Sequence, residues 1–368
     1  MKLFQKQIMN TLFGIVLASS LIGCASPVVE EAGPTQTFVP TTEPFVEVEQ
    51  PAQLSPKARA AREYLESAFD IIEEDALNSD QVDWEDLREE VFTRQQGVTD
   101  ISAQHIQIEY ILTKLNDHHS TFMTPQEAKE IFWEAPLEYA PIPKGNLTAG
   151  QYGYIWMGGF GSADPEVMNA YASILQQIVK DLDAQSPCAW VVDLRDNTGG
   201  NMQPMVAGLG ELIGDGLIGQ GINRQGKVIF QGYYKDGGYW SDGEVIAQAS
   251  DPDFELQHKN LPIIILIGPN TMSAGEMLAV SFRGNPNAKL IGHETIGLTT
   301  GKGLYELSDG AVILLTVTLH VDPTGQVYGG KVTPDVLLEG NGVGSSVERE
   351  TIPGDVLDWL AENVVCEK

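Results

Sequence analysis

The sequence predicts an α/β fold, because strongly apolar strand patterns alternate with helical patterns along its second half. The strand patterns are almost continuously apolar, as in a sheet buried on both faces, and they occupy residues 152–157, 189–194, 261–267 and 311–319. Helical spacing of apolar residues begins near Asp164 and again at residues 273–282. This alternation favours a core whose functional loops lie at the ends of its strands.

The segment ahead of this core is expected to form a small helical domain at residues 57–135, followed by the α/β core at residues 136–368. Apolar residues recur three and four apart in residues 56–77, 83–92 and 100–115. Thr124, with Pro125 and Glu127 after it, has the pattern of a further helix start. Residues 116–122 are expected to form a loop between helices.

The first 23 residues have the features of a secretion signal, with Lys2 and Lys6 ahead of an apolar stretch too short for an ordinary spanning helix. The sequence LIGC that ends at Cys24 resembles the lipobox of bacterial lipoproteins. The resemblance implies that Cys24 is lipidated and anchors the chain to a bacterial membrane, outside the cytoplasm; plain secretion is the alternative. Residues 24–56 are rich in Pro, Thr and Glu and are expected to form a disordered tether.

The chain is strongly acidic, with 51 acidic against 22 basic residues and a formal net charge of -29. Such a charge argues against nucleic acid or an anionic membrane surface as partner, and it favours cationic or neutral substrates. Outside the cytoplasm, Cys188 and Cys366 could form a disulfide or could remain two buried thiols.

Ser273 opens the predicted helix at residues 273–282, and two interpretations fit it. With Glu276 it has the spacing of a capping box, which only starts the helix. A serine at a helix start is also suited to be a nucleophile, because the helix dipole favours negative charge there and the N–H of Ala274 is left to bind an oxyanion.

Two further loops could carry chemistry. Gly199 and Gly200 can point their N–H groups at a ligand, although a tight turn with positive φ would explain the same pair. Asp117, His118 and His119 suggest a metal site, but the companion aspartate clusters of a two-metal centre are missing from the sequence, so we expect neither metal nor cofactor. His119 is either an ordinary hydrogen-bonded histidine or a general base for the serine.

These loops together resemble the tail-specific, or C-terminal processing, serine peptidases and their tricorn-core relatives. The resemblance extends from about Asp83 to Asp335 and rests on motifs in the family's order, LNDHHSTF, VVDLRDNTGG, NTMSAGEM, IGHETIGLTTG, LSDGAVILLT and KVTPDV. It implies stacked strand-strand-helix units like those of crotonase and Clp protease. It also implies hydrolysis of peptide bonds through a serine acyl-enzyme.

The resemblance assigns roles by motif position. Ser273 would be the nucleophile, the N–H groups of Gly200 and Ala274 would bind the oxyanion, and Gly199 would turn its loop toward the serine. The processing peptidases use a lysine base, which falls here on Leu298.

Lys302 follows Leu298 in a Gly-rich stretch, at about 13 Å when fully extended, so it is not expected to reach Ser273. The tricorn-like branch uses a histidine in the loop that holds His119, which makes His119 the expected base. The group that orients His119 stays open between Asp117, a backbone carbonyl and an acidic residue of the C-terminal segment.

The chain leaves no room for a PDZ domain between Phe122 and Tyr152, so a short peptide or an unfolded protein is the expected substrate. A ligand-binding module without catalysis is the alternative, because the interphotoreceptor retinoid-binding proteins resemble this family and also lack that domain. An α/β-hydrolase esterase would instead need Asp309 and His320 as partners of the serine.

Overall fold

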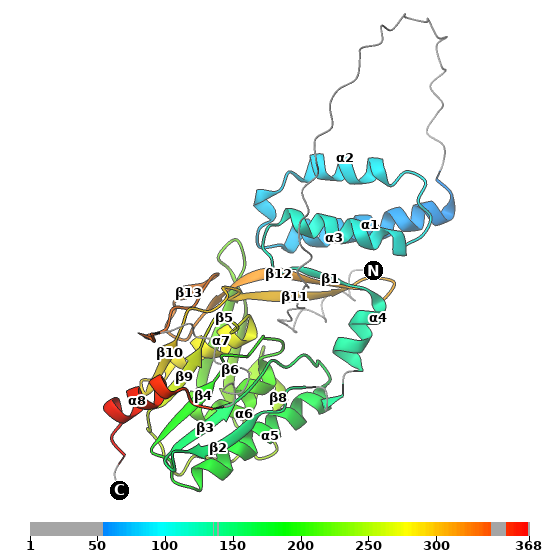
Figure 1. Ribbon diagram of the computed structural model, residues 1–368. Helices are drawn as coiled ribbons and strands as arrows, with labels where there is room; N and C mark the ends of the chain where they lie inside the picture. Colours follow the sequence, from blue (N-terminus) through cyan, green and yellow to red (C-terminus); the bar gives the residue numbers. More distant parts are fainter. Residues whose placement is uncertain (1–53, 135, 138–139, 340–350, 367–368) are drawn as a thin grey trace, which may run out of the picture.

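The computed structural model describes residues 54–134, 136–137, 140–339 and 351–366 (Figure 1). Cys24, the predicted signal peptide at residues 1–23 and the predicted tether up to residue 53 lie outside these residues. Within the part of the chain that is described, no helix is both long and apolar enough to cross a membrane.

The N-terminal region is helical, as predicted. It contains α1 (Pro56–Asp75), α2 (Trp84–Arg94) and α3 (His105–Lys114), with short 3-10 turns at Ser79–Gln81 and Ser102–Gln104. The hydroxyl of Ser55 accepts the N–H of Ala58 and starts α1. Apolar side chains of the three helices pack on one face of β12 (Val312–Val321), through Ile313 and Leu315 among others. The helices therefore cover a sheet of the core (Figure 1).

That sheet has eight strands and is antiparallel. Its order is β1-β12-β5-β6-β7-β8, with β11 and β13 also paired to β12. Besides β12, the strands are β1 (Thr121–Met123), β5 (Gly216–Ile222), β6 (Val228–Lys235), β7 (Gly238–Ser241), β8 (Glu244–Gln248), β11 (Thr300–Glu306) and β13 (Val327–Tyr328). Residues 116–122 were expected to be only a loop; they end in β1, which ties the N-terminal region to the core sheet.

The second sheet has six strands in the order β14-β10-β9-β4-β3-β2, all parallel except β2. They are β2 (Lys144–Thr148), β3 (Tyr152–Trp156), β4 (Ala189–Asp193), β9 (Ile263–Ile267), β10 (Ala288–Gly292) and β14 (Val336–Leu337). The predicted apolar strands at 152–157, 189–194 and 261–267 thus lie side by side at its centre. The prediction of an α/β fold is confirmed.

Helices cover both faces of the six-stranded sheet. One face packs against α5 (Pro165–Asp183), α6 (Gln203–Ile213) and α7 (Ala274–Ser281), and the other packs against α8 (Gly354–Asn363). The short α4 (Pro125–Ala128) continues into a π-helical turn, Lys129–Trp133, and a 3-10 turn at Phe282–Gly284 follows α7. A disulfide between Cys188 and Cys366, with the two Cα atoms 5.3 Å apart, joins the residue before β4 to the segment after α8.

Candidate active site

Ser273 lies in the turn that joins β9 to α7, at the carboxyl end of the parallel strands. Its φ of 50° and ψ of -115° are strained for a residue that has a side chain. The predicted capping box with Glu276 is present, and Oε2 of Glu276 accepts the N–H of Ser273 at 2.8 Å. The first interpretation of this serine is therefore correct, and it does not exclude the second.

The hydroxyl of Ser273 also contacts His119, which comes from the loop ahead of β1. Nε2 of His119 lies 3.0 Å from Oγ of Ser273, and both side chains are buried. Pairing of β1 with β12 fixes the far end of this loop. The two side chains that the sequence analysis expected to meet are therefore in hydrogen-bonding contact.

Thr300, the first residue of β11, orients the imidazole. Its Oγ1 lies 2.7 Å from Nδ1 of His119. When Nδ1 carries the proton and donates a hydrogen bond to Oγ1 of Thr300, Nε2 presents its lone pair to Ser273. This is the tautomer that a general base needs. The partner left open above is thus a neutral hydroxyl, and nothing in the Thr- and Gly-rich sequence around Thr300 indicated it.

Asp117 holds the backbone of the histidine loop instead of the imidazole. Its Oδ1 accepts the N–H groups of His119 and Ser120, at 3.0 and 2.9 Å, and its Oδ2 accepts the Ser120 hydroxyl at 2.6 Å. Oγ of Ser120 accepts the N–H of Thr316, which ties the loop to β12. The carboxylate therefore acts on His119 through the main chain.

The charges around His119 favour its neutral form. Burial lowers the pKa of His119 well below 6.5, and the nearby charge of Lys302 lowers this pKa further. Lys302 is completely buried, and burial lowers its pKa to about 7 although the charge of Asp117 acts in the opposite direction. Lys302, expected to lie beyond reach of Ser273, is thus an electrostatic neighbour of His119.

Gly199 and Gly200 turn the loop after β4 inward against the serine. Their φ angles are 91° and 104°. A Cβ atom on Gly199 would lie 2.9 Å from Cβ of Ser273, and one on Gly200 would lie 1.9 Å from the carbonyl oxygen of Phe160. Within the described residues, no acceptor is found for the N–H of Gly200 or of Ala274. Two free donors therefore belong to the loops that surround the Ser273 hydroxyl.

Two side chains hold these loops through contacts that were not recognised in the sequence. Asn197 accepts the N–H of Gly199 with its Oδ1 at 3.0 Å. Besides capping α7, Glu276 accepts the N–H of Gly297 at 2.9 Å and the N–H of Leu298 at 2.7 Å. Glu276 gave a signal only as a cap residue, because its partners lie in a distant loop.

The esterase triad is not assembled. The carboxylate of Asp309 binds the hydroxyl of Tyr64 at 3.0 Å and Nε2 of His105 at 2.7 Å, and it thereby links the N-terminal helices to the turn between β11 and β12. His320 is buried without a hydrogen-bond partner among the described residues, and burial lowers its pKa to about 4. His118 is exposed.

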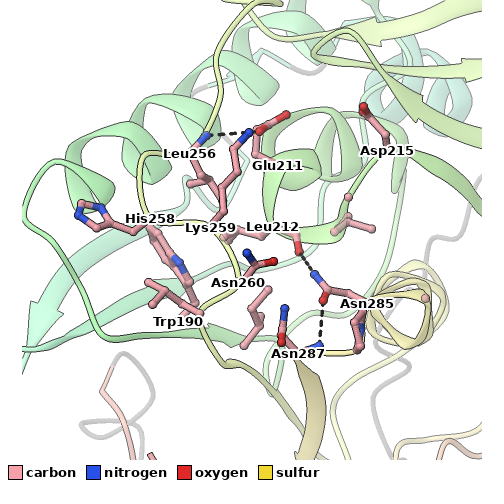
Figure 2. A pocket seen from close by; sticks show the side chains of 16 residues that line it. Trp190, Glu211, Leu212, Asp215, Leu256, His258, Lys259, Asn260, Asn285 and Asn287 are labelled. Atoms are coloured by element: carbon pink, nitrogen blue, oxygen red, sulfur yellow. Dashed lines mark hydrogen bonds between the residues drawn. The ribbon is translucent and has the colours of Figure 1, made fainter. Parts of the chain in front are cut away.

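A cavity of about 370 Å³ lies at the amino ends of the parallel strands of the six-stranded sheet, opposite to the end where Ser273 lies (Figure 2). It is lined by residues at the amino ends of β4 and β9, Trp190 and Ile263, and by the end of α6. None of the candidate site residues lines it. In the described part of the chain, no group of three or more His, Cys, Asp and Glu side chains is arranged to hold a metal ion.

Comparisons with known proteins point to one family. Residues 151–338 match the model described as Peptidase family S41. The chain is 31% identical over 159 residues to a nisin-resistance protein of Lactococcus lactis subsp. lactis, which covers 43% of this chain and 48% of the relative. It is 28% identical over 188 residues to a carboxyl-terminal-processing protease of Synechocystis sp., which covers 51% of this chain and 38% of the relative. The chain therefore spans less than half the length of these relatives.

Solved structures share the fold. A lipoprotein from Streptococcus agalactiae superposes with a TM-score of 0.66 at 21% identity, covering 86% of this chain and all (100%) of that one. The photosystem II D1 C-terminal processing protease superposes with a TM-score of 0.51 at 17% identity, covering 77% of this chain and 94% of that one. At these identities the likeness concerns the fold alone.

Proposed function

Because the chain belongs to peptidase family S41, we propose that it hydrolyses peptide bonds through an acyl-enzyme, with Ser273 as nucleophile and His119 as general base. The observation that supports this most directly is the 3.0 Å contact between Nε2 of His119 and Oγ of Ser273. Imidazole within hydrogen-bonding reach of a hydroxyl is the geometry that activates a serine.

In the first half of the reaction, Oγ of Ser273 attacks the carbonyl carbon of the peptide bond while its proton passes to Nε2 of His119. The negative charge that develops on the carbonyl oxygen is stabilised by the N–H groups of Gly200 and Ala274, at the positive end of α7. When the tetrahedral intermediate collapses, the imidazolium donates its proton to the departing amine. The acyl group is left as an ester on Ser273.

In the second half, a water molecule takes the place of the amine. Nε2 of His119 accepts a proton from this water as its oxygen attacks the ester carbonyl. The new tetrahedral intermediate collapses with return of the proton to Oγ of Ser273, which releases the acid and restores the site. Thr300 holds the imidazole in one tautomer through both halves.

We also propose a peptide or unfolded protein as substrate and a location outside the cytoplasm, with the chain anchored at Cys24. The acidic surplus favours cationic peptides. The name of the Lactococcus relative makes nisin a substrate to test, and the description of the Streptococcus structure as a lipoprotein supports the anchor. Metabolic labelling with palmitate should mark the chain and should be lost in Cys24→Ala.

Labelling with a fluorophosphonate probe tests the catalytic proposal. Wild type should be labelled, Ser273→Ala should not, and His119→Ala should react at least about 100-fold more slowly, because general-base catalysis contributes about that much. The matched control is His118→Ala, which alters the adjacent exposed histidine and should react normally. A folded wild type that resists the probe would instead support a ligand-binding module without catalysis.

A further inference from the structure

Lys302 is a buried basic residue that the proposed reaction does not use. It lies on β11 opposite Thr316 of β12, and its side chain is completely buried. The N–H of Thr316 binds Ser120 in the loop that also contains Asp117 and His119. Thr316 thus connects the two segments, because it pairs with Lys302 on β11 and binds Ser120 of the histidine loop.

Asp117 and burial act on the charge of Lys302 in opposite ways. Asp117 favours the charged ammonium, whereas burial favours the neutral amine and brings its pKa to about 7. In turn the ammonium opposes protonation of His119. The neighbouring positions of β11 and β12 carry Thr300, Thr316 and Thr318, which do not titrate in this range, and the neutral, buried His320.

We propose that Lys302 is a positioning residue that acts through His119. Its ammonium form keeps the imidazole unprotonated in acid, and its neutral form permits the imidazolium that forms during the reaction. This inference rests on the function proposed above. During attack by Ser273 the proton moves to His119 and a positive charge appears in a buried site. A charged Lys302 disfavours that charge, and a neutral Lys302 does not.

The proposal predicts two steps in the reactivity of the wild type as pH rises. The first step, well below pH 6.5, is the loss of the proton from His119, and the second, near pH 7, is the loss of the proton from Lys302. Each step raises the rate, because each removes a positive charge that opposes proton transfer to Nε2. The rate constant for labelling by the fluorophosphonate probe, measured from the lowest pH at which the protein stays folded up to pH 9, reports both.

Two substitutions separate the roles of the side chain and its charge. Lys302→Met should abolish the step near neutral pH and move the acid step upward, because a like charge near the imidazole is gone. Lys302→Arg keeps the charge, so the acid step should stay low while the rate above pH 8 falls below that of wild type. Lys289→Met, at an exposed position on β10, should leave both steps in place.

A direct titration keeps the test independent of catalysis. In Ser273→Ala protein, the imidazole signals can be followed by NMR across the same pH range, with His119 assigned by its loss in Ser273→Ala/His119→Gln. Lys302→Met should raise the midpoint of His119. An unmoved His119 midpoint would overturn the proposal, and so would a His119→Ala enzyme that still reacts with a step near pH 7, since Lys302 would then be the base.

The outcomes distinguish this inference from the proposed function. If the wild type reacts with the probe but its two steps survive in Lys302→Met, the peptidase stands and the role of Lys302 is refuted. If the wild type does not react, the peptidase fails, and the NMR titration still decides whether Lys302 controls the charge of His119.

Discussion

At the scale of single residues, the site is notable for what holds His119. Serine hydrolases of the triad type place a carboxylate at the second imidazole nitrogen, where it stabilises the imidazolium that forms during attack. Here the hydroxyl of Thr300 occupies that position at 2.7 Å, and the carboxylate of Asp117 binds the loop backbone. We infer that the Thr300 hydroxyl contributes mainly by orienting the imidazole of His119, and not by stabilising its positive charge.

Thr300→Val tests this inference. Removal of the hydroxyl should lower kcat by about 10- to 100-fold, because the imidazole is no longer held in the orientation and tautomer that the reaction needs. KM should change little. Steady-state hydrolysis of a peptide substrate measures both. The control is Thr299→Val, since the neighbouring hydroxyl binds the carbonyl of Gly330 and not the imidazole; equal losses in the two variants would contradict the role of Thr300.

Lys302 should also leave a mark on stability. Its pKa is 10.5 when exposed and about 7 in the fold, so between these values the unfolded chain binds one more proton than the folded chain. The free energy of unfolding therefore rises with pH across this window, and at pH 7 and below burial of the charge costs on the order of a few kcal/mol. Lys302→Met should be more stable than wild type at pH 7, and its advantage should shrink by pH 9.5.

Urea unfolding at the two pH values measures this difference, with Lys289→Met as the control. A Lys302→Met protein no more stable at pH 7 than wild type would show that the ammonium is better solvated than its burial indicates.

At the scale of elements, the loops after β4 and β9 depend on glycine where the backbone approaches itself. Gly200→Ala would place Cβ 1.9 Å from the carbonyl of Phe160, so the loop must move. We expect the rate of fluorophosphonate labelling to fall by at least about 100-fold, because one of the two proposed oxyanion donors is displaced. Gly214→Ala is the matched control: its φ of 101° is similar, but nothing lies within 4 Å of the added atom.

Gly214→Ala should therefore lose about 1–3 kcal/mol of stability through backbone strain alone and keep its reactivity. Labelling rates and urea unfolding of both variants decide the point. A Gly200→Ala protein with the wild-type labelling rate would refute the assignment of this loop to the oxyanion site.

The elements that the sequence predicted well are those with a strong apolar pattern. The strands at the centre of the six-stranded sheet and the helix beginning at Asp164 follow from such patterns. Strands β5 to β8 were missed because glycines and polar residues interrupt them. A signal was available: Asp236-Gly237 and Asp242-Gly243 both have positive φ angles in tight turns between these strands, and Asp-Gly is the typical sequence of such hairpin turns.

The site was less accessible to the sequence. The approach of His119 to Ser273 was expected only through resemblance to a family, because no local pattern relates two segments so far apart. Thr300 and Lys302 could not be predicted, since a register shift in β11 between Gly301 and Lys302 sets where their side chains point. A lysine in a Gly-rich stretch is typically exposed, and only the fold buries this one.

At the scale of the whole molecule, the disulfide ties the C-terminal helix to the sheet. It connects residues 178 apart in sequence. Cys188→Ser/Cys366→Ser should lower the free energy of unfolding by about 2–4 kcal/mol. Cys188 precedes the amino end of β4, whereas Ser273 lies at the carboxyl ends of the parallel strands. The labelling rate should therefore not change. Loss of labelling in a folded double variant would contradict this separation of stability from reactivity.

The proposed catalytic pair is divided between the covering helices' side of the molecule and the α/β core, and its members are 154 positions apart in sequence. A chain that is still being synthesised, or one that is folded only in its N-terminal half, has His119 in place without Ser273 beside it. Under the proposed function, the ability to hydrolyse peptides therefore arises only in the finished tertiary structure, and a partly folded copy cannot cut itself or its neighbours.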